Sequence, residues 1–165
     1  MKTLKVKLTG TSPLLMHAYK GNDNPELKNQ SPRDQAEFGT YRSATGELIL
    51  PTENIHRAMI AGANYVKKGL GRKISGAAII QEPEMPVGAK DFSVDSRGVV
   101  VMKNRIVRHR ARIEKWGGTF NVEYDGTLIT EKELKAVVEK TGQLIGIGDF
   151  RPEKKGPFGR FTVAF

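Results

Sequence analysis

The order of hydrophobic patterns along the chain is the feature that most constrains its fold. Residues 3–9 alternate between apolar and polar side chains, a period of two that is typical of a half-buried strand. Apolar residues then recur at helical spacing over residues 52–68 and again over residues 134–145. Residues 161–165 return to alternation. The chain therefore begins and ends with a strand and contains two amphipathic helices between them.

Residues that favour helix ends support both helices. Thr52 follows Pro51 and is expected to cap the first helix. Thr130 and Glu133 have the spacing of a capping box, in which each residue bonds the other's backbone amide. Gly146 is expected to end the second helix, because glycine readily adopts the left-handed conformation found there.

The segment between the helices contains further strand patterns. Residues 77–80, 105–116 and 120–124 are expected to form strands, and residues 95–98 (DSRG) are expected to form the turn of an inserted hairpin. Without the insertions, the order is the βαββαβ arrangement of ferredoxin-like and RRM-type α+β folds, with two helices on one face of the sheet. We therefore expect one RRM-like domain over residues 1–165. Its expected additions are a long loop at about 18–40, an inserted hairpin at about 82–103 and a glycine-rich loop at 146–160.

The charge balance indicates a polyanionic partner. The chain has 27 Lys and Arg residues against 18 Asp and Glu residues, a formal net charge of +9. Such an excess favours association with nucleic acid.

Basic residues also recur at strand spacing. If residues 105–116 form a strand, Arg108, Arg110 and Arg112 share one face at intervals of roughly 7 Å, which suits a phosphate backbone. Lys5 and Lys7 occupy the polar face of the first strand. We expect these residues to lie together on the helix-free face of the sheet. The track could be extended by Arg57, Arg72 and Lys73.

The glycine-rich loop is longer than a connector requires. Its glycines would let backbone amides approach a phosphate, and its cations are Arg151, Lys154, Lys155 and Arg160. Phe158 lies among polar residues and is expected to be exposed for base stacking. The loop lacks the order of a P-loop, which joins a strand to a helix. The alternative is a basic surface hairpin with no ligand.

Catalytic and metal sites are weakly indicated. The three histidines are far apart in sequence, so no metal site and no cofactor are expected. His17 is a weak candidate for a general base in RNA cleavage. The chain has no cysteine and no apolar run of about 20 residues, and we expect a cytoplasmic protein with no membrane partner.

Three segments resemble the RAMP superfamily of CRISPR-associated proteins. They are the loop and strand at 146–163 (GIGDFRPEKKGPFGRFTV), the opening VKLTGTSPLL at 6–15, and LPTENIHRAM at 50–59. The resemblance implies an RNA-binding backbone subunit of antiviral defence that assembles head to tail along guide RNA. It also implies that a hairpin at about 91–103 separates bases. The short length suggests a minimal or phage-encoded relative.

Our leading hypothesis is a non-catalytic protein that binds single-stranded nucleic acid, RNA in preference to DNA, and self-associates along the strand. One alternative is a metal-independent endoribonuclease that uses His17 or His56. Another is a protein that docks into a CRISPR complex as a mimic or inhibitor.

Overall fold

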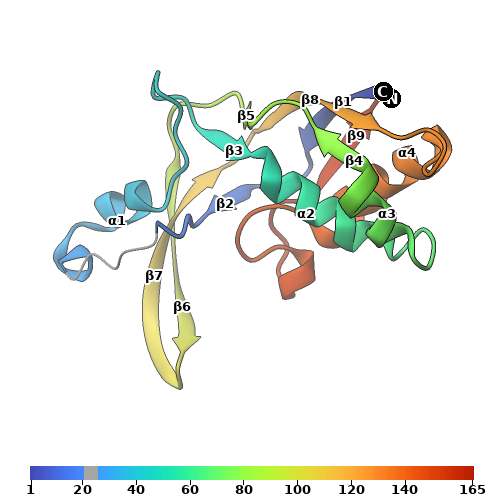
Figure 1. Ribbon diagram of the computed structural model, residues 1–165. Helices are drawn as coiled ribbons and strands as arrows, with labels where there is room; N and C mark the ends of the chain where they lie inside the picture. The colour runs from blue at the N-terminus through green and yellow to red at the C-terminus, as the bar shows by residue number, and fades with distance from the viewer. Residues whose placement is uncertain (21–25) are drawn as a thin grey trace.

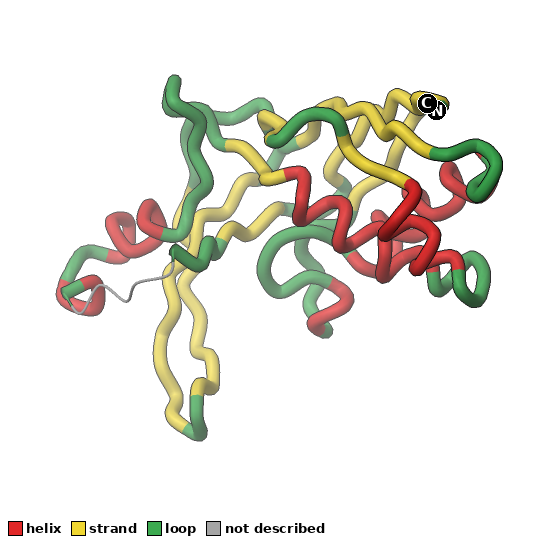
Figure 2. The backbone as a smooth tube through the Cα atoms, in the orientation of Figure 1, coloured by secondary structure: helices red, strands yellow, loops and turns green. Residues whose placement is uncertain are grey.

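The computed structural model describes residues 1–20 and 26–165. Within these ranges the chain forms a mixed structure of antiparallel sheets and four α-helices (Figures 1 and 2). A hairpin projects from the body at the lower left of Figure 1, and the two chain ends lie together at the upper right.

The largest sheet has four antiparallel strands in the order β4-β8-β1-β9. Their bounds are β1 Lys2–Gly10, β4 Ala78–Ile80, β8 Gly117–Tyr124 and β9 Phe161–Ala164. The first and last strands of the chain are neighbours in this sheet, as the alternating patterns suggested. Leu4, Val6 and Leu8 are buried, while Lys5 and Lys7 are exposed.

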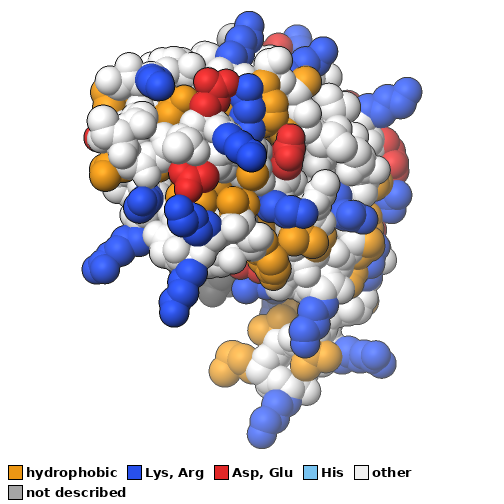
Figure 3. Space-filling model, turned by 90° about the vertical axis from the view of Figure 1, so that its right-hand side faces the viewer, with side chains coloured by type: hydrophobic (Ala, Val, Ile, Leu, Met, Phe, Trp, Pro, Cys, Tyr) orange, Lys and Arg blue, Asp and Glu red, His pale blue; other side chains and the backbone are white. Residues whose placement is uncertain are grey.

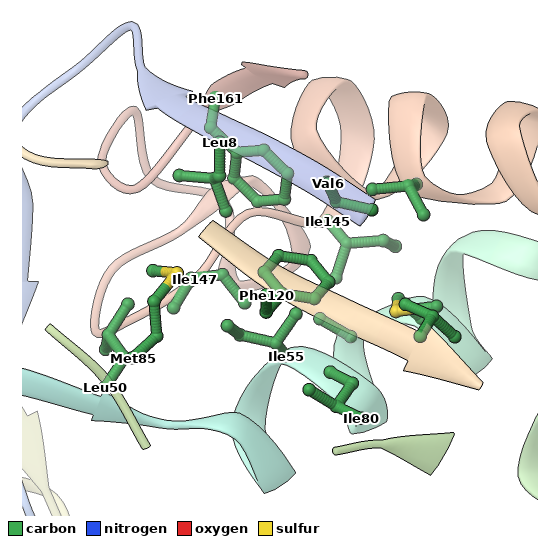
Figure 4. Packing of buried hydrophobic residues seen from close by; sticks show 14 of the residues in the cluster. Val6, Leu8, Leu50, Ile55, Ile80, Met85, Phe120, Ile145, Ile147 and Phe161 are labelled. Carbon is green, nitrogen blue, oxygen red and sulfur yellow. The ribbon is translucent and has the colours of Figure 1, made fainter. Parts of the chain in front are cut away.

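Helices cover the apolar face of this sheet and form the core with it. They are α2 Thr52–Ala63, α3 Leu70–Ala77 and α4 Glu131–Lys140, and α4 continues into a π-helical turn at Thr141–Ile145. Figure 4 shows Val6, Phe120 and Ile55 meeting between the sheet and α2. Because these side chains are fully buried, the sheet and helices are fixed as one packed unit.

The predicted N-terminal cap is confirmed for α4 but is wrong for α2. Thr130 Oγ1 accepts a 3.1 Å hydrogen bond from the Glu133 amide, and the Glu133 carboxylate accepts one of 3.0 Å from the Thr130 amide, so the capping box is confirmed. Thr52 is not the cap of α2. It is the first helical residue after Pro51, and its hydroxyl instead donates to the carbonyl of Glu82 at 2.5 Å.

The inserted hairpin lies later in the chain than predicted. It consists of β6 Ser93–Val101 and β7 Asn104–Ile113, and the whole of β6 pairs with residues 104–112 of β7. The turn is at Met102 and Lys103, both with positive φ (50° and 68°). Two-residue hairpin turns of this kind usually contain Asn-Gly, and Met-Lys lacks that signature. Residues 95–98, expected to turn, continue the strand.

This hairpin belongs to a separate sheet. The sheet has the order β2-β7-β6, with β2 at Leu14–Met16, and a further pair joins β3 Ile49–Pro51 to β5 Glu84–Pro86. Arg108, Arg110 and Arg112 therefore do not share a face with Lys5 and Lys7, and the expected common basic face is wrong.

A segment that we expected to be a long loop contains helices. The predicted loop at 18–40 includes a 3-10 turn at Leu27–Asn29 and α1 Pro32–Phe38, whose cap Ser31 accepts a hydrogen bond from the Asp34 amide. Residues 21–25 of that segment lie outside the described residues. Arg72 and Lys73, which we expected to extend the basic track, are exposed on α3.

Candidate nucleic-acid interface

A cleft of about 320 Å³ opens between β2, the first turns of α2 and the glycine-rich loop. Its floor is apolar and includes Leu50 and Ala58. Polar side chains from separate parts of the chain line its walls: His17, Tyr41, Asn54, Arg57, Asp149, Arg151 and Glu153. The fold therefore brings three of the sequence-predicted residues, His17, Arg57 and Arg151, to one cavity.

The glycine-rich loop is held tightly against β2. The Asp149 amide donates to the Leu15 carbonyl and the Gly159 amide to the Pro13 carbonyl, both at 2.8 Å. Gly159 has a φ of +73°, and a Cβ there would lie 1.7 Å from the Ile147 carbonyl oxygen. The glycines thus permit close packing of the loop on itself.

This packing corrects our expectation that the glycine amides approach a phosphate. The amides of Gly146, Gly156 and Gly159 donate to the carbonyls of Thr141, Arg151 and Pro13 respectively. The loop therefore positions side chains, since these amides are already committed within the protein.

Arg110 joins the hairpin to this loop. Its side chain is 6% exposed, and its Nε lies 2.5 Å from a carboxylate oxygen of Asp149. Burial lowers the pKa of Arg110, and the Asp149 carboxylate opposes this change by favouring the charged form. Arg110 therefore lies buried at the base of the hairpin, paired with Asp149, and this position favours a structural role over the predicted phosphate contact.

A second charged cluster buries Phe158, which was predicted to be exposed. Phe158 is 6% exposed, and the guanidinium carbons of Arg97 and Arg112 lie 4.9 Å and 5.5 Å from its ring centre. Arg97 hydrogen-bonds the buried Asp95 and thereby lowers the pKa of that carboxyl. The guanidinium groups of Arg97 and Arg112 thus cover the Phe158 ring. The ring could stack on a base only if it left this site.

Ion pairs separate the predicted cations into two groups. Four have a carboxylate partner: Arg57 with Glu53, Arg110 with Asp149, Arg112 with Glu114 and Asp95, and Arg151 with Glu153. In the part of the chain that the structure describes, the others form no such ion pair: Lys5, Lys7, Arg72, Lys73, Arg108, Lys154, Lys155 and Arg160.

Only some of these unpaired cations lie near the cleft. Lys154, Lys155 and Arg160 are exposed on the loop that forms one wall, and Arg108 is half-buried on β7 beside Arg110. Lys5 and Lys7 project from the open face of the four-stranded sheet, and Arg72 and Lys73 from α3; none of the four lines the cleft.

His17 lies at the cleft beside charged groups that the sequence did not place near it. His17 is exposed as a residue, but partial burial of its imidazole lowers its pKa. The positive charges of Arg108 and Arg110 lower that pKa further, and Asp149 opposes them. His17 is therefore held toward its neutral form. His56 lies elsewhere, with Nε2 3.3 Å from the Ile74 carbonyl.

The hairpin tip has an apolar surface that sequence reasoning missed. Val100, Met102 and Val107 are 69%, 91% and 61% exposed. Lys103 and Arg105 are exposed between them, and Figure 3 shows hydrophobic and basic side chains together on the lowest projection. Three consecutive valines before Met102 are the sequence signal for this surface.

The described residues contain neither a metal-binding cluster nor a membrane-spanning helix. Across residues 1–20 and 26–165, no group of three His, Asp or Glu side chains is arranged to hold a metal ion. No helix in the same ranges is both long and apolar enough to cross a membrane.

Comparisons with known proteins include a weak similarity to a solved structure. No family model matches the chain, and no curated protein matches it. Among solved structures, the chain is similar to a Cas6 product complex, with a TM-score of 0.28 and 8% sequence identity over 97% of this chain. The chain spans about half (50%) of the length of that protein. A TM-score this low does not define a shared fold, so the function is argued from the site itself.

Proposed function

We propose that this protein binds single-stranded nucleic acid, RNA in preference to DNA, without cleaving it. The observation that carries the proposal is the placement of unpaired cations around one cleft. Lys154, Lys155 and Arg160 are exposed on the glycine-rich loop, of which residues 146–149, Arg151 and Glu153 line the cleft. Arg108 lies on the hairpin, close enough to His17 at the cleft to lower its pKa. Phosphate contacts from such side chains supply most of the affinity in non-specific binding.

Two paired arginines add to this surface. Arg57 pairs with Glu53 one helical turn away, and both side chains are largely exposed, at 73% and 68%. Exposed pairs of this kind contribute only about 0.3–0.5 kcal/mol, so a phosphate can replace the Glu53 carboxylate at small cost. Arg151 pairs with Glu153 and lines the cleft in the same way.

The hairpin tip provides a second kind of contact. Aliphatic side chains such as Met and Ile can wedge between neighbouring bases and unstack them. Met102 projects from the turn with Val100 and Val107 behind it. Met102→Asp should leave stability within about 0.5 kcal/mol, because the residue is 91% exposed. The same change should weaken RNA binding, and unchanged affinity would remove the tip from the interface.

The proposal includes a finer description of the fold. The strand order β4-β8-β1-β9, with helices after β1 and β8, is consistent with the ferredoxin-like βαββαβ arrangement. The sequence resemblance to RAMP backbone subunits favours RNA as the ligand and copies of the protein side by side along it.

Fluorescence anisotropy tests the proposal directly. Labelled single-stranded RNA and DNA 30-mers are titrated with protein at several salt concentrations. We expect binding that weakens linearly in log affinity against log salt, with several protein copies per strand. Absence of binding at low salt would contradict the proposal and favour a protein partner instead.

His17 supports a second candidate function, a metal-independent endoribonuclease. A neutral His17 could accept the proton of a ribose 2′-hydroxyl, whose oxygen would attack the adjacent phosphorus and break the bond to the 5′ oxygen. The products would be a 2′,3′-cyclic phosphate and a 5′-hydroxyl, with solvent supplying the leaving oxygen's proton. Cleavage of labelled RNA in EDTA that disappears in His17→Ala would establish this activity. Intact RNA would leave the binding proposal standing.

A further inference from the structure

The projecting hairpin has an edge strand with no neighbour on its outer side. Strand β6 pairs with β7 on one side, and no strand or backbone hydrogen bond meets its other side across residues 1–20 and 26–165. The outer part of the hairpin stands clear of the body (Figure 1). Because a two-stranded ribbon is only marginally stable in water, this edge would gain stability from a third strand.

The turn determines which backbone groups of β6 point outward. Residues 102–103 form a two-residue turn, so the residues at its two ends, Val101 and Asn104, form a hydrogen-bonded pair. Bonded and non-bonded pairs alternate along an antiparallel ribbon. The amides and carbonyls that point away from β7 therefore belong to every second residue of β6: Ser96, Gly98 and Val100.

Charge distinguishes this edge from the opposite edge of the ribbon. From Gly98 to Val101, β6 has three valines and no charged side chain. Proteins usually protect such an edge with lysine, proline or a bulge. The β7 strand instead carries Arg105 and Arg108, and neither forms an ion pair within the described ranges. Two β7 edges would therefore repel each other, whereas two β6 edges would not.

We propose that β6 pairs antiparallel with β6 of a second copy of the chain, so that two hairpins form one four-stranded sheet. An antiparallel edge is complementary to itself about a two-fold axis, so a second copy supplies the matching strand. The partner strand would also cover Val100, which is 69% exposed. The residues that line the cleft all lie outside β6, so the dimer retains the proposed nucleic-acid site.

This inference specifies a surface for the self-association in the proposed function, and it rests on that function only for its role along RNA. The dimer itself forms without nucleic acid. Its formation is therefore measured on the protein alone, and RNA binding is measured separately by anisotropy.

Sedimentation velocity tests the interface. Because the contact is small, we expect a monomer of 18.2 kDa at about 5 µM and a species of twice that mass at about 200 µM. Val100→Lys places a charge on the free edge and should be monomeric at both concentrations. Val107→Lys is the matched control: it adds the same charge to the same face, at a residue of similar exposure (61%) on β7, and should dimerise like wild type.

Hydrogen exchange resolved to single amides gives a readout that needs no variant. The amides of Gly98 and Val100 should exchange at least about tenfold more slowly at the higher concentration, because the partner strand accepts their hydrogen bonds. The amides of Arg105 and Val107 point outward from β7 and should exchange equally fast at both concentrations.

Three results would overturn the inference: a wild type that stays monomeric, a dimer that both lysine variants retain or both lose, and protection of the β7 amides in place of the β6 amides. RNA binding by a wild type that stays monomeric would leave nucleic-acid binding intact while overturning this interface. A dimer that Val100→Lys alone abolishes, in a protein that binds no RNA, would support the interface and refute the proposed function.

Discussion

Replacement of Arg110 should affect stability far more than nucleic-acid binding. Its guanidinium is buried, its Nε lies 2.5 Å from Asp149, and its Nε and Nη1 have no hydrogen-bond partner in the described residues. Removal of one member of a buried ion pair costs about 3–5 kcal/mol, because the remaining charge is left without compensation. Asp149 is 31% exposed and can be partly hydrated, so we expect a loss near 3 kcal/mol for Arg110→Ala.

Urea denaturation followed by Trp116 fluorescence measures this loss. Trp116 is the only tryptophan and is 5% exposed, so its emission should change on unfolding. A loss of about 3 kcal/mol corresponds to a fall in melting temperature of roughly 6–12 °C for a chain of this size. The double variant Arg110→Met/Asp149→Leu should recover most of the stability, because neither charge is then left alone in the interior.

Arg108→Ala is the matched control. Arg108 lies two residues away on the same strand and has no carboxylate partner in the described residues. We expect little change in its unfolding free energy and a clear loss of RNA affinity. If Arg110→Ala folds with wild-type stability and loses binding instead, the assignment of Arg110 to the protein interior is wrong.

Three further predictions concern the loop and the second long helix. Lys154→Ala/Lys155→Ala should reduce the slope of log affinity against log salt by about 1.4, at about 0.7 per lost phosphate contact; an unchanged slope would place the strand elsewhere. Gly159→Ala should destabilise the protein strongly because its Cβ would lie 1.7 Å from a backbone oxygen, whereas Gly46→Ala, with φ +84° and open space, should cost only about 1 kcal/mol by urea denaturation. The amide of Thr130 holds the pKa of Glu133 at about 2, so this carboxylate stabilises the fold above its unfolded pKa near 4.5 and less as the pH falls toward 2. The stability difference between wild type and Glu133→Ala should therefore be about 1 kcal/mol at pH 7 and shrink over that interval, and a difference that persists at pH 2 would contradict the capping role.

Much of the fold followed from local signals in the sequence. Alternation placed the strands at 3–9 and 161–165, and the capping box placed the start of α4, because each depends on neighbouring residues. The hairpin turn was misplaced because Met102 and Lys103 adopt positive φ without a turn signature. Helix α1 was missed because its apolar contact is limited to one buried residue, Ala36.

The site was harder to predict because it depends on contacts distant in sequence. In sequence, Arg110 has the same strand spacing as Arg108 and Arg112. It differs from them because it pairs with Asp149, which the glycine-rich loop brings next to it. Phe158 was expected to be exposed because its neighbours in sequence are polar, but arginines from the hairpin cover its ring. No pattern in one sequence specifies which strand a loop will pack against.

The most direct test of the central claim compares two triple variants that lose the same charge. Arg108→Ala/Lys154→Ala/Lys155→Ala removes cations beside the cleft, and Arg72→Ala/Lys73→Ala/Lys132→Ala removes exposed cations on α3 and α4. Anisotropy with a labelled RNA 30-mer should show a large loss of affinity and a shallower salt slope for the first variant, with the second close to wild type. Equal losses in both would mean that net charge alone attracts the RNA, and the cleft would not be the binding site.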